Sequence, residues 1–480
     1  MKTVRPLSTS SIRLLLCFLI GLCLFVSTPK RAAAYSLLTH EELVDLAWNS
    51  SIRGLLLQRF PNTTEAELQT AHAFAYGGCA IQDMGYYPFG HAFFSDLTHY
   101  VRTGDFIDAL FRNAHTVNEY AFALGALSHY LADNIGHQNA INLSTPVEFP
   151  GLEKKYGPVV TYDEDPHAHV RTEFAFDIYQ LSQQRFAPAN YKEMIGLQVP
   201  RRQMERAFFE TYGLTLRSQL GRERPAFRSY RSSVRHFVPR IAYAEALIHQ
   251  HEFPADNTGP EFQKLQNRLA KAEAEGDWAK YNHPPGIGTH LLGYAIRIIP
   301  KVGVFSILGI RGPTADTESK YVTSLNNTDD AFDQWIAQVQ KQDHPVLQLP
   351  NLDLDTGAVI APGSYRLIDK TYADLLLRIT KDPNRLVPAT LKKNLIDFYA
   401  DPHAPIATKK NKKAWARVQR ELPILQGMKT VTLQTAKKIA DGVIPTEAMP
   451  PTNVVPASNG APPVKGVIKG AGNTATILRP

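Results

Sequence analysis

Three side chains of the kind that bind metals recur at four-residue intervals beside an apolar stretch of the chain. His129, Asp133 and His137 follow residues 121–127, which are all apolar or glycine. An α-helix turns about 100° per residue, so these side chains project from nearly one face. Two imidazoles and a carboxylate are costly to bury there unless they are paired or bind a metal. The pattern predicts a helix with a metal-binding face or, alternatively, a solvated polar stripe with a satisfied core histidine.

Further ligand-type residues lie on both sides of this triplet. His169 and Glu173 form a second pair four residues apart, again on one helix face. His40, Asp83 and His99 precede the triplet, and the last two border aromatic segments rather than charged runs. Each residue taken alone is more often structural than functional. Together they favour a metal site over a solvated face.

The first 34 residues have the pattern of a cleaved secretory signal. Lys2, Arg5 and Arg13 precede an apolar stretch over residues 14–26, and Ala32–Ala34 supply an Ala-x-Ala cleavage site. Cleavage after Ala34 would leave Tyr35 as the first residue. We therefore expect an exported protein, either secreted or periplasmic.

The order of the ligand-type residues resembles that of the zinc-dependent phospholipase C and S1/P1 nuclease superfamily. The resemblance covers roughly residues 35–212 and implies an all-α fold that holds up to three zinc ions. In that family the free amine and carbonyl of the mature first residue are ligands. The family usually begins with Trp, whereas this chain would begin with Tyr35. Because main-chain atoms bind the metal, Tyr can serve as well as Trp.

The resemblance also implies a role for each ligand-type residue. The implied ligands of one zinc are Asp83, His99 and His129, and Asp133 would bridge this zinc to a second. The Tyr35 main chain and His40 would complete the second zinc. The implied ligands of a third zinc are His137, His169 and Glu173. The family normally has two more residues, usually with a proline, between the bridging Asp and the next His. The chain departs from the pattern at His137, and His167 is a nearby alternative ligand.

The implied activity is hydrolysis of a phosphodiester by metal-activated water. Bound zinc ions neutralise the phosphodiester charge and lower the pKa of water, and Asp83 would orient or deprotonate that water. The sequence contains no Gly-x-Ser-x-Gly motif and no Gly-rich phosphate loop ending in Lys-Ser or Lys-Thr. Metal-assisted attack by water is therefore the simplest mechanism left.

The main expectation is a phospholipase C that cleaves phospholipid head-group esters. Tyr86, Tyr87 and Phe89 could bind a quaternary ammonium head group by cation–π contact, although core packing is their ordinary role. An S1/P1-like nuclease is the competing enzyme, in which aromatic rings stack on bases. A non-catalytic exported metal-binding scaffold is a further alternative, because the altered spacing at His137 could remove the third zinc.

Charge and cysteine content narrow these alternatives. The chain has 52 Lys and Arg against 45 Asp and Glu, and loss of the five basic signal residues leaves 47 against 45, a net charge of +2. Such a small net charge argues against non-specific electrostatic binding to nucleic acid, so no stable nucleic-acid complex is expected. After cleavage Cys79 is the one remaining cysteine, which excludes an internal disulfide. A buried thiol is a better interpretation of Cys79 than an accessory metal contact.

Residues 287–310 form the most apolar segment after the signal. Arg297, Pro300 and Lys301 interrupt it, so it does not read as a membrane span. It can be a kinked pair of buried helices or an interfacial segment in peripheral contact with lipid. A basic cluster around Trp415 is a second candidate for an anionic membrane surface, and a solvated helix face is its ordinary alternative.

Helical spacing of apolar residues recurs along most of the chain, and period-two strand patterns are scarce. Thr39 and Glu42 match a capping box at the start of a helix. The predicted helices cover residues 43–60, 65–76, 117–131, 170–181, 204–214, 234–251, 261–274 and 372–379. The fold class is therefore all-α, with many helices.

Composition divides the chain into four parts. Residues 1–34 are the signal, and 35–340 form the phospholipase C-like helical domain. Residues 341–443 form a helical extension that begins with a loop or short hairpin. Residues 444–480 are rich in Pro, Gly, Ala and Thr and lack aromatic residues, which predicts a disordered tail.

Overall fold

The structure, a computed structural model, describes residues 37–249, 259–283, 286–301, 309–341 and 348–443. The predicted signal, Tyr35 and the predicted tail lie outside the described residues. Within the described ranges the chain is helical nearly throughout, which confirms the all-α prediction. Two strands of two residues each pair in parallel, Val387 with Thr430 and Pro388 with Val431.

The elements follow one another as a long series of α-helices, with short 3-10 and π-helices labelled η. In chain order they are α2 (Leu37–Ala47), η1 (Trp48–Ile52), α3 (Arg53–Arg59), α4 (Glu65–Gly78), η2 (Ile81–Tyr86), α5 (Ala92–Tyr100), α6 (Thr103–Arg112), α7 (Val117–Gly136), η3 (His137–Ile141), α8 (Asn142–Glu148), α9 (Pro150–Tyr156), α10 (Pro166–Ser182), α11 (Ala189–Ile195), α12 (Arg201–Tyr212), α13 (Leu216–Leu220), α14 (Glu223–Ser232), η4 (Ser233–Phe237), α15 (Val238–His249), α16 (Pro260–Gly276), η5 (Trp278–Tyr281), α17 (Ile287–Ile298), α18 (Ala315–Gln340), α19 (Arg366–Thr380), β1 (Val387–Pro388), α20 (Ala389–Phe398), η7 (Ala407–Lys410), α21 (Lys412–Gly427), β2 (Thr430–Val431) and α22 (Leu433–Ala440).

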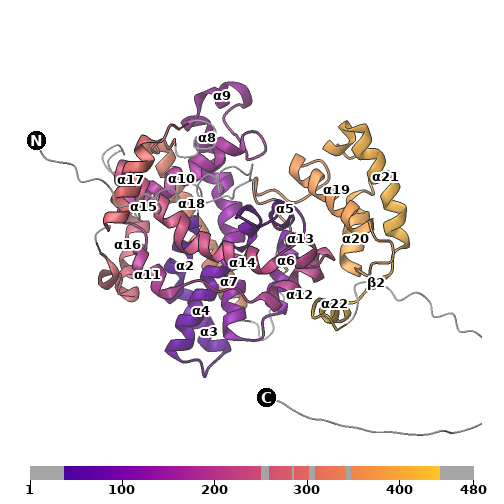
Figure 1. Ribbon diagram of the computed structural model, residues 1–480, viewed down its shortest axis with the longest axis horizontal. Helices are drawn as coiled ribbons and strands as arrows, with labels where there is room; N and C mark the ends of the chain where they lie inside the picture. The colour runs from indigo at the N-terminus through magenta and orange to yellow at the C-terminus, as the bar shows by residue number, and fades with distance from the viewer. Residues whose placement is uncertain (1–36, 250–258, 284–285, 302–308, 342–347, 444–480) are drawn as a thin grey trace, which may run out of the picture.

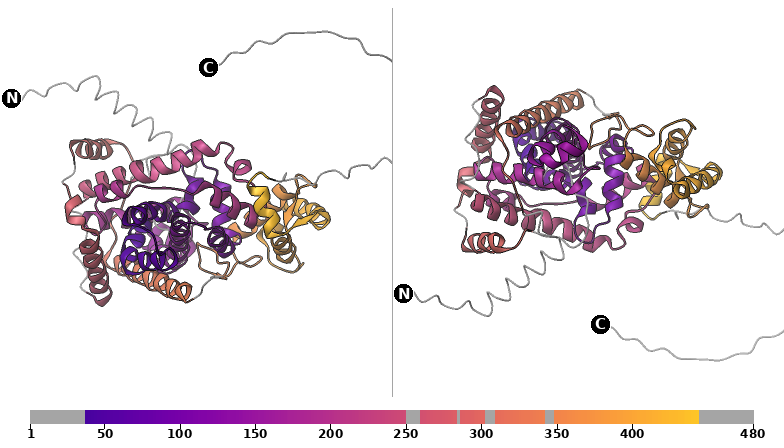
Figure 2. Two further views of the ribbon diagram at one scale, coloured as in Figure 1. Left: turned by 90° about the horizontal axis from the view of Figure 1, so that it is seen from below. Right: turned by 90° about the horizontal axis from the view of Figure 1, so that it is seen from above.

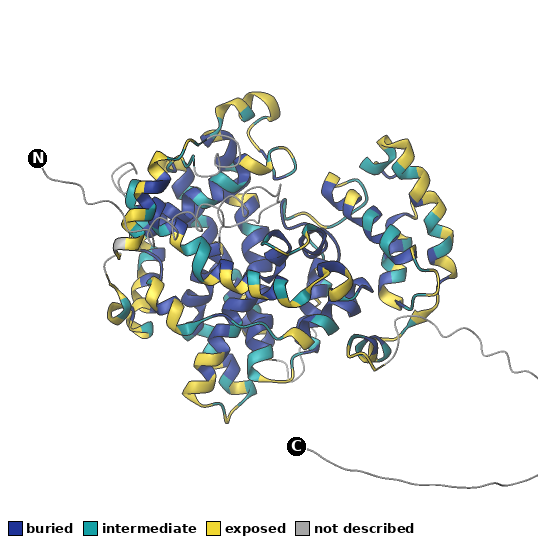
Figure 3. Cartoon of the chain, viewed as in Figure 1, coloured by how far each residue is buried: buried dark blue, intermediate teal, exposed yellow. Residues whose placement is uncertain are grey.

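Helices α2 and α7 and the second half of α4 lie in the interior of the molecule. Figure 1 shows them between α15, α16 and α17 at one edge and α19, α20 and α21 at the opposite edge. Figure 2 shows from two further sides that the later helices surround the N-terminal ones. Dark blue interior faces and yellow outer faces in Figure 3 agree with this arrangement. The helix that carries the predicted metal-binding face is therefore a core helix.

The contact between α4 and α7 depends on two glycines. A Cβ at Gly78 would lie 2.1 Å from the Phe122 carbonyl oxygen, and one at Gly125 would lie 2.0 Å from the Ala75 carbonyl oxygen. No larger side chain fits at either position without moving a backbone. Because the two helices touch through their main chains, the residues that follow α4 are brought against α7.

Capping boxes fix the starts of both of these helices. Thr64 caps α4 with Glu67, and Thr116 caps α7 with Glu119. The capping box predicted at Thr39 and Glu42 is wrong. Thr39 lies inside α2, and its amide and hydroxyl both donate to the Asp177 carboxylate. A tertiary contact with α10 therefore takes the place of the local cap.

One hydrophobic core joins the first half of the chain to the C-terminal helices. Leu124 of α7, Leu354, Leu376 of α19 and Leu391 of α20 all belong to the same buried cluster. The predicted boundary near residue 341 falls where residues 342–347 lie outside the described chain. The four-part division stays a prediction, and the core is continuous on either side of this boundary.

Candidate metal centre

Six elements bring the predicted ligands to one buried region. All eight ligands within the described chain are at most 5% exposed. They are His40 on α2, Asp83 on η2, His99 on α5, His129 and Asp133 on α7, His137 at the start of η3, and His169 and Glu173 on α10. The Tyr35 main chain, the ninth predicted ligand, lies outside the described residues.

Asp133 lies at the centre of the first ligands. Its Oδ2 atom is 3.1 Å from His129 Nε2 and 3.3 Å from His99 Nε2, and its Oδ1 atom is 3.4 Å from His40 Nε2. Asp83 Oδ1 lies 3.4 Å from His99 Nε2. The ligand atoms form two groups, Asp83 with His99 and His129, and His40 with His129 and Asp133, each able to surround one ion. Asp133 is thus placed to bridge two ions.

A third group lies further along the same helix face. His169 Nε2 is 3.1 Å from His137 Nε2 and 2.9 Å from Glu173 Oε1. His137 has α-helical backbone angles at the end of α7, so it stays on the face of Asp133 despite its unusual spacing. The alternative ligand His167 is exposed and belongs to none of the three groups.

Main-chain carbonyls fix the rings of three histidines. Nδ1 lies 2.8 Å from the Ser95 oxygen in His99, 2.9 Å from the Cys79 oxygen in His129 and 2.7 Å from the Leu354 oxygen in His137. Because a carbonyl only accepts, each Nδ1 carries a proton and donates it. This hydrogen bond leaves the Nε2 lone pair for a metal.

The first two groups contain buried atoms that face other ligands and form no hydrogen bond, whereas in the third group His137 Nε2 contacts His169 and Glu173. His99 Nε2, His129 Nε2 and both Asp133 carboxylate oxygens are buried and form no hydrogen bond. Buried polar atoms without partners are costly, and coordination to a cation removes that cost. Imidazole nitrogens and carboxylate oxygens are donors that zinc accepts. The residues present therefore fit zinc.

Burial and neighbouring charges set different protonation states in the groups. Burial lowers the pKa of His137 to about 4 and the pKa of His169 well below its usual value. Burial also raises the pKa of Glu173 well above its usual range. Without an ion, the third group therefore consists of two neutral imidazoles and a protonated carboxyl group.

In the two groups around Asp133, the pKa values of two histidines are raised rather than lowered. Burial alone lowers the pKa of His99 and His129, but the nearby Asp133 and Asp83 carboxylates outweigh it, so both pKa values are raised. Burial also acts to raise the pKa of Asp133, yet His129 and His99 hold it below its usual range. Asp133 is therefore an ionised carboxylate between protonated imidazoles until a cation displaces the protons.

The three aromatic residues proposed for substrate binding have different surroundings. Tyr86 is buried, with its ring centroid 6.0 Å from that of His99. Tyr87 is half-buried, and its ring makes an edge contact with Tyr230 at 5.6 Å between centroids. Phe89 is 70% exposed and has a left-handed backbone with φ of 63°. Their roles in substrate binding stay predictions.

Cys79 is fully buried, and its Sγ atom lies in none of the three ligand groups. The thiol instead donates to the Tyr76 carbonyl oxygen at 3.3 Å. The contribution of this residue to the centre is its carbonyl oxygen, which accepts from His129.

Sequence reasoning missed a segment after residue 348 that reaches the centre. Leu354 supplies the carbonyl for His137, and Asp355 is buried with Oδ1 3.6 Å from His137 Nδ1. We expected a loop or short hairpin there, and the predicted catalytic residues lie far upstream in the sequence. Two carboxylates, Asp353 and Asp355, in an otherwise apolar run were the available signal.

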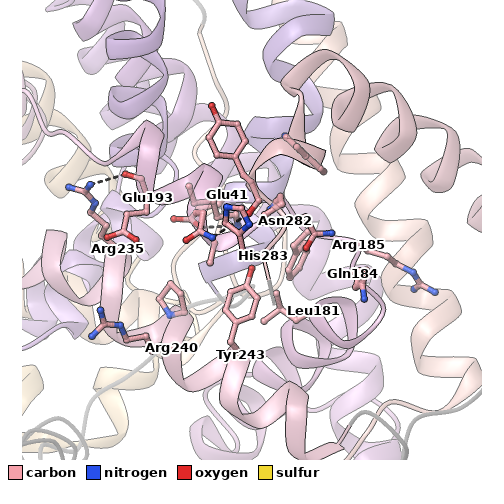
Figure 4. Close-up of a pocket in the computed structure, with 18 of the residues that line it drawn as sticks. Glu41, Leu181, Gln184, Arg185, Glu193, Arg235, Arg240, Tyr243, Asn282 and His283 are labelled. Atoms are coloured by element: carbon pink, nitrogen blue, oxygen red, sulfur yellow. Dashed lines mark hydrogen bonds and ion pairs between the residues drawn. The ribbon is translucent and has the colours of Figure 1, made fainter. Parts of the chain in front are cut away.

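A separate cavity of about 560 Å³ lies beside α2. Figure 4 shows Glu41, Tyr243 and His283 close together within it, with Arg235 and Arg240 to one side. At its base Lys192 Nζ lies 2.9 Å from Glu41 Oε2, and both side chains are buried. None of the predicted ligands lines this cavity, so it is distinct from the metal centre.

Comparison with known proteins finds a family match within this chain. Residues 39–221 match the family model described as zinc dependent phospholipase C. The matched segment contains all eight ligands described above. This match confirms the predicted resemblance to the zinc-dependent phospholipase C family over residues 39–221. Comparisons with curated proteins and with solved structures found no match.

Proposed function

We propose that the protein is an exported zinc-dependent phosphodiesterase that hydrolyses phospholipid head-group esters. The family domain supports a phospholipase C-type function. The observation that carries the proposal is the set of three buried ligand groups, two of which contain unsatisfied atoms that face other ligands. Cleavage of the bond between the phosphate and the glycerol oxygen would release diacylglycerol and a phosphorylated head group.

Asp83 is the residue that we assign to catalysis. Zinc, when bound, neutralises the phosphodiester charge and makes water a competent nucleophile near neutral pH. Asp83 Oδ1 is buried, forms no hydrogen bond and lies 3.4 Å from His99 Nε2. A carboxylate in this position can orient the attacking water and accept its proton, while His99 holds the carboxylate in place.

Substitution Asp83→Asn tests this role. We expect turnover of phosphatidylcholine to fall at least about 100-fold, because general-base catalysis contributes roughly 10²–10⁴-fold. Helicity should be unchanged. The control is Asp329→Asn, which alters a buried carboxylate outside the ligand groups. Full turnover by the Asp83→Asn protein would refute the mechanism.

The supporting proposal of export rests on the signal pattern. Cleavage after Ala34 would give Tyr35 the free amine that the family uses as a ligand. The mass of the secreted protein tests this point directly. A mature chain that begins at another residue would rule out Tyr35 as a ligand.

The alternatives differ in substrate and metal content. A nuclease would cleave single-stranded DNA with the same metals, using Tyr86, Tyr87 or Phe89 as stacking surfaces. A non-catalytic scaffold would fold with one zinc or none and turn over neither substrate. Assays of both substrates on one zinc-analysed sample separate the three functions.

We also propose that α17 makes a peripheral contact with the lipid surface. Leu291, Tyr294 and Ile298 recur along this helix and are 53%, 68% and 64% exposed. Residues 278–315 contain no Asp or Glu, so the surroundings of the helix favour an anionic surface. Part of the predicted interfacial segment, residues 302–308, lies outside the described chain. None of the helices in the described ranges has the length and apolar character that spanning a membrane requires.

A further inference from the structure

A short hairpin beyond the matched family segment reaches the metal centre. Leu352 and Val359 form an antiparallel bridge, and Asp353 N donates to the Ala358 carbonyl at 2.8 Å. Gly357, with φ of 72°, occupies the turn. We call residues 351–360 the 351–360 hairpin.

The main chain of this hairpin is hydrogen-bonded to α5, which carries His99, and to the helices α6 and α8. The bonds are Leu352 N to Thr103 Oγ1 at 3.0 Å, Leu354 N to the His99 carbonyl at 3.1 Å, and Asn142 Nδ2 to the Asp355 carbonyl at 2.7 Å. These contacts reach α5, α6 and α8. A loosely attached extension would not place its backbone groups so completely against another part of the fold.

Two buried carboxylates hold the residues on either side of Leu354. Asp353 accepts from the Asp355 amide at 2.9 Å and from the Thr356 hydroxyl at 2.7 Å. Asp355 Oδ2 accepts from the Tyr100 hydroxyl at 2.8 Å and from the Tyr365 hydroxyl at 2.9 Å. The position of the Leu354 carbonyl is therefore determined from both sides.

That carbonyl oxygen lies 2.7 Å from His137 Nδ1. It fixes the proton on Nδ1 and leaves Nε2 as the lone pair that faces His169 and Glu173. The Nδ1 atoms of His99 and His129 also donate to main-chain carbonyls, and those carbonyls lie inside residues 39–221. The carbonyl that accepts from His137 lies outside that segment. His137 is also the ligand whose spacing departs from the family pattern.

We propose that Leu354 is a positioning residue for the third ligand group and that the 351–360 hairpin is a working part of the metal centre. The proposal rests on the proposed function, because it requires that His137, His169 and Glu173 hold zinc. It goes beyond that function in assigning the support of one zinc ion to a segment outside the family domain.

Substitution Asp353→Ala tests the proposal in the full-length processed protein. It removes the carboxylate that accepts from the Asp355 amide and the Thr356 hydroxyl, and so loosens the segment around Leu354 without altering any ligand. Zinc content is measured after dialysis against chelators of graded strength. We expect one of three zinc ions to bind about 10–100-fold more weakly, the usual cost of losing a residue that supports a ligand. The control Asp401→Ala removes a similar turn, in which the His403 amide donates to Asp401 at 2.7 Å, and should keep three ions.

A second variant keeps the test decisive if Asp353→Ala fails to fold. Tyr365→Phe removes one hydroxyl bound to Asp355 and should weaken the same zinc ion. Its control, Tyr372→Phe, removes a buried hydroxyl bound to Asn394 at 3.1 Å, away from the centre. Long-range ¹H–¹⁵N spectra of the zinc-free protein should show His137 with its proton on Nδ1, and a mixture of tautomers in the Tyr365→Phe protein.

The outcomes distinguish this proposal from the proposed function. Folded variants that hold all three zinc ions as tightly as the unaltered chain, with the same His137 tautomer, would overturn the role of the hairpin alone. Absence of zinc from the unaltered chain would overturn the proposed function before any substitution is made.

Discussion

At the scale of single residues, Asp133 determines the charge of the centre. It is fully buried, with three imidazole Nε2 atoms 3.1–3.4 Å from its two oxygens. The raised pKa values of His99 and His129 mean that protons offset its charge when no cation is present. Zinc requires neutral imidazoles as ligands, so it must displace these protons.

Zinc binding should therefore release protons and strengthen as pH rises. The zinc-free protein holds protons on His99, His129 and the Glu173 carboxyl group, whose pKa values are all raised. Raising the pH removes these protons, so the apparent affinity should increase as the pH rises past the ordinary histidine pKa, above which both imidazole pKa values lie. Titration calorimetry in buffers of different protonation enthalpy measures the number released. Heats that do not depend on the buffer would contradict this description.

At the residue scale, the sequence allowed prediction of which side chains lie close together only where the side chains themselves carry a spacing pattern. His129, Asp133 and His137 share a helix, so their spacing alone placed them on one face, and the structure brings all eight described ligands together. Leu354 could not be found in this way, because its carbonyl oxygen is common to every residue. Its partner His137 is 217 positions away in the chain.

At the scale of elements, the junction of α4 and α7 sets the positions of Asp83 and His129. Gly78 and Gly125 allow the two backbones to touch, and the Cys79 carbonyl just after α4 then reaches the His129 ring. Helix type and the capping residues near Thr64 and Thr116 follow from local sequence. The close approach does not, because it depends on which glycines face each other across two helices.

Gly125→Ala should destabilise the protein. The new methyl group would lie 2.0 Å from the Ala75 carbonyl oxygen, so the helices must separate. We expect the free energy of unfolding to fall by roughly 1–3 kcal/mol, as overpacked cores usually show. Gly54→Ala is the matched control, since no atom lies within 4 Å of its new methyl group and helix propensity favours Ala by up to about 1 kcal/mol. Chemical denaturation measures both, and equal stability of the two variants would contradict the packing argument.

At the scale of the whole molecule, the all-α class follows from the period of apolar residues, but the arrangement of the helices does not. Leu124 and Leu376 are more than 250 positions apart and share one core. Composition indicated a boundary near residue 341, where a loop or short hairpin begins the helical extension. It did not indicate that the chain beyond that point packs against the metal centre. Non-local packing of this kind leaves little trace in local periodicity.

The proposed lipid contact of α17 also belongs to the scale of the whole molecule. Replacing both Leu291 and Tyr294 with Ser should reduce binding to anionic phospholipid vesicles at least about tenfold, because each large apolar side chain contributes on the order of 1.5–3 kcal/mol when buried. Cosedimentation with vesicles measures this change. Leu433→Ser on α22, which is 40% exposed, is the control. Unchanged vesicle binding by the double variant would rule out α17 as the contact.

The central claim is that the three buried ligand groups form a zinc centre that cleaves phospholipids. The most direct test is zinc stoichiometry of the secreted, processed protein, with phosphatidylcholine and single-stranded DNA turnover measured on the same sample. We predict three zinc ions and cleavage of the lipid. DNA cleavage without lipid cleavage would identify a nuclease instead, and absence of both zinc and turnover would contradict the proposed function.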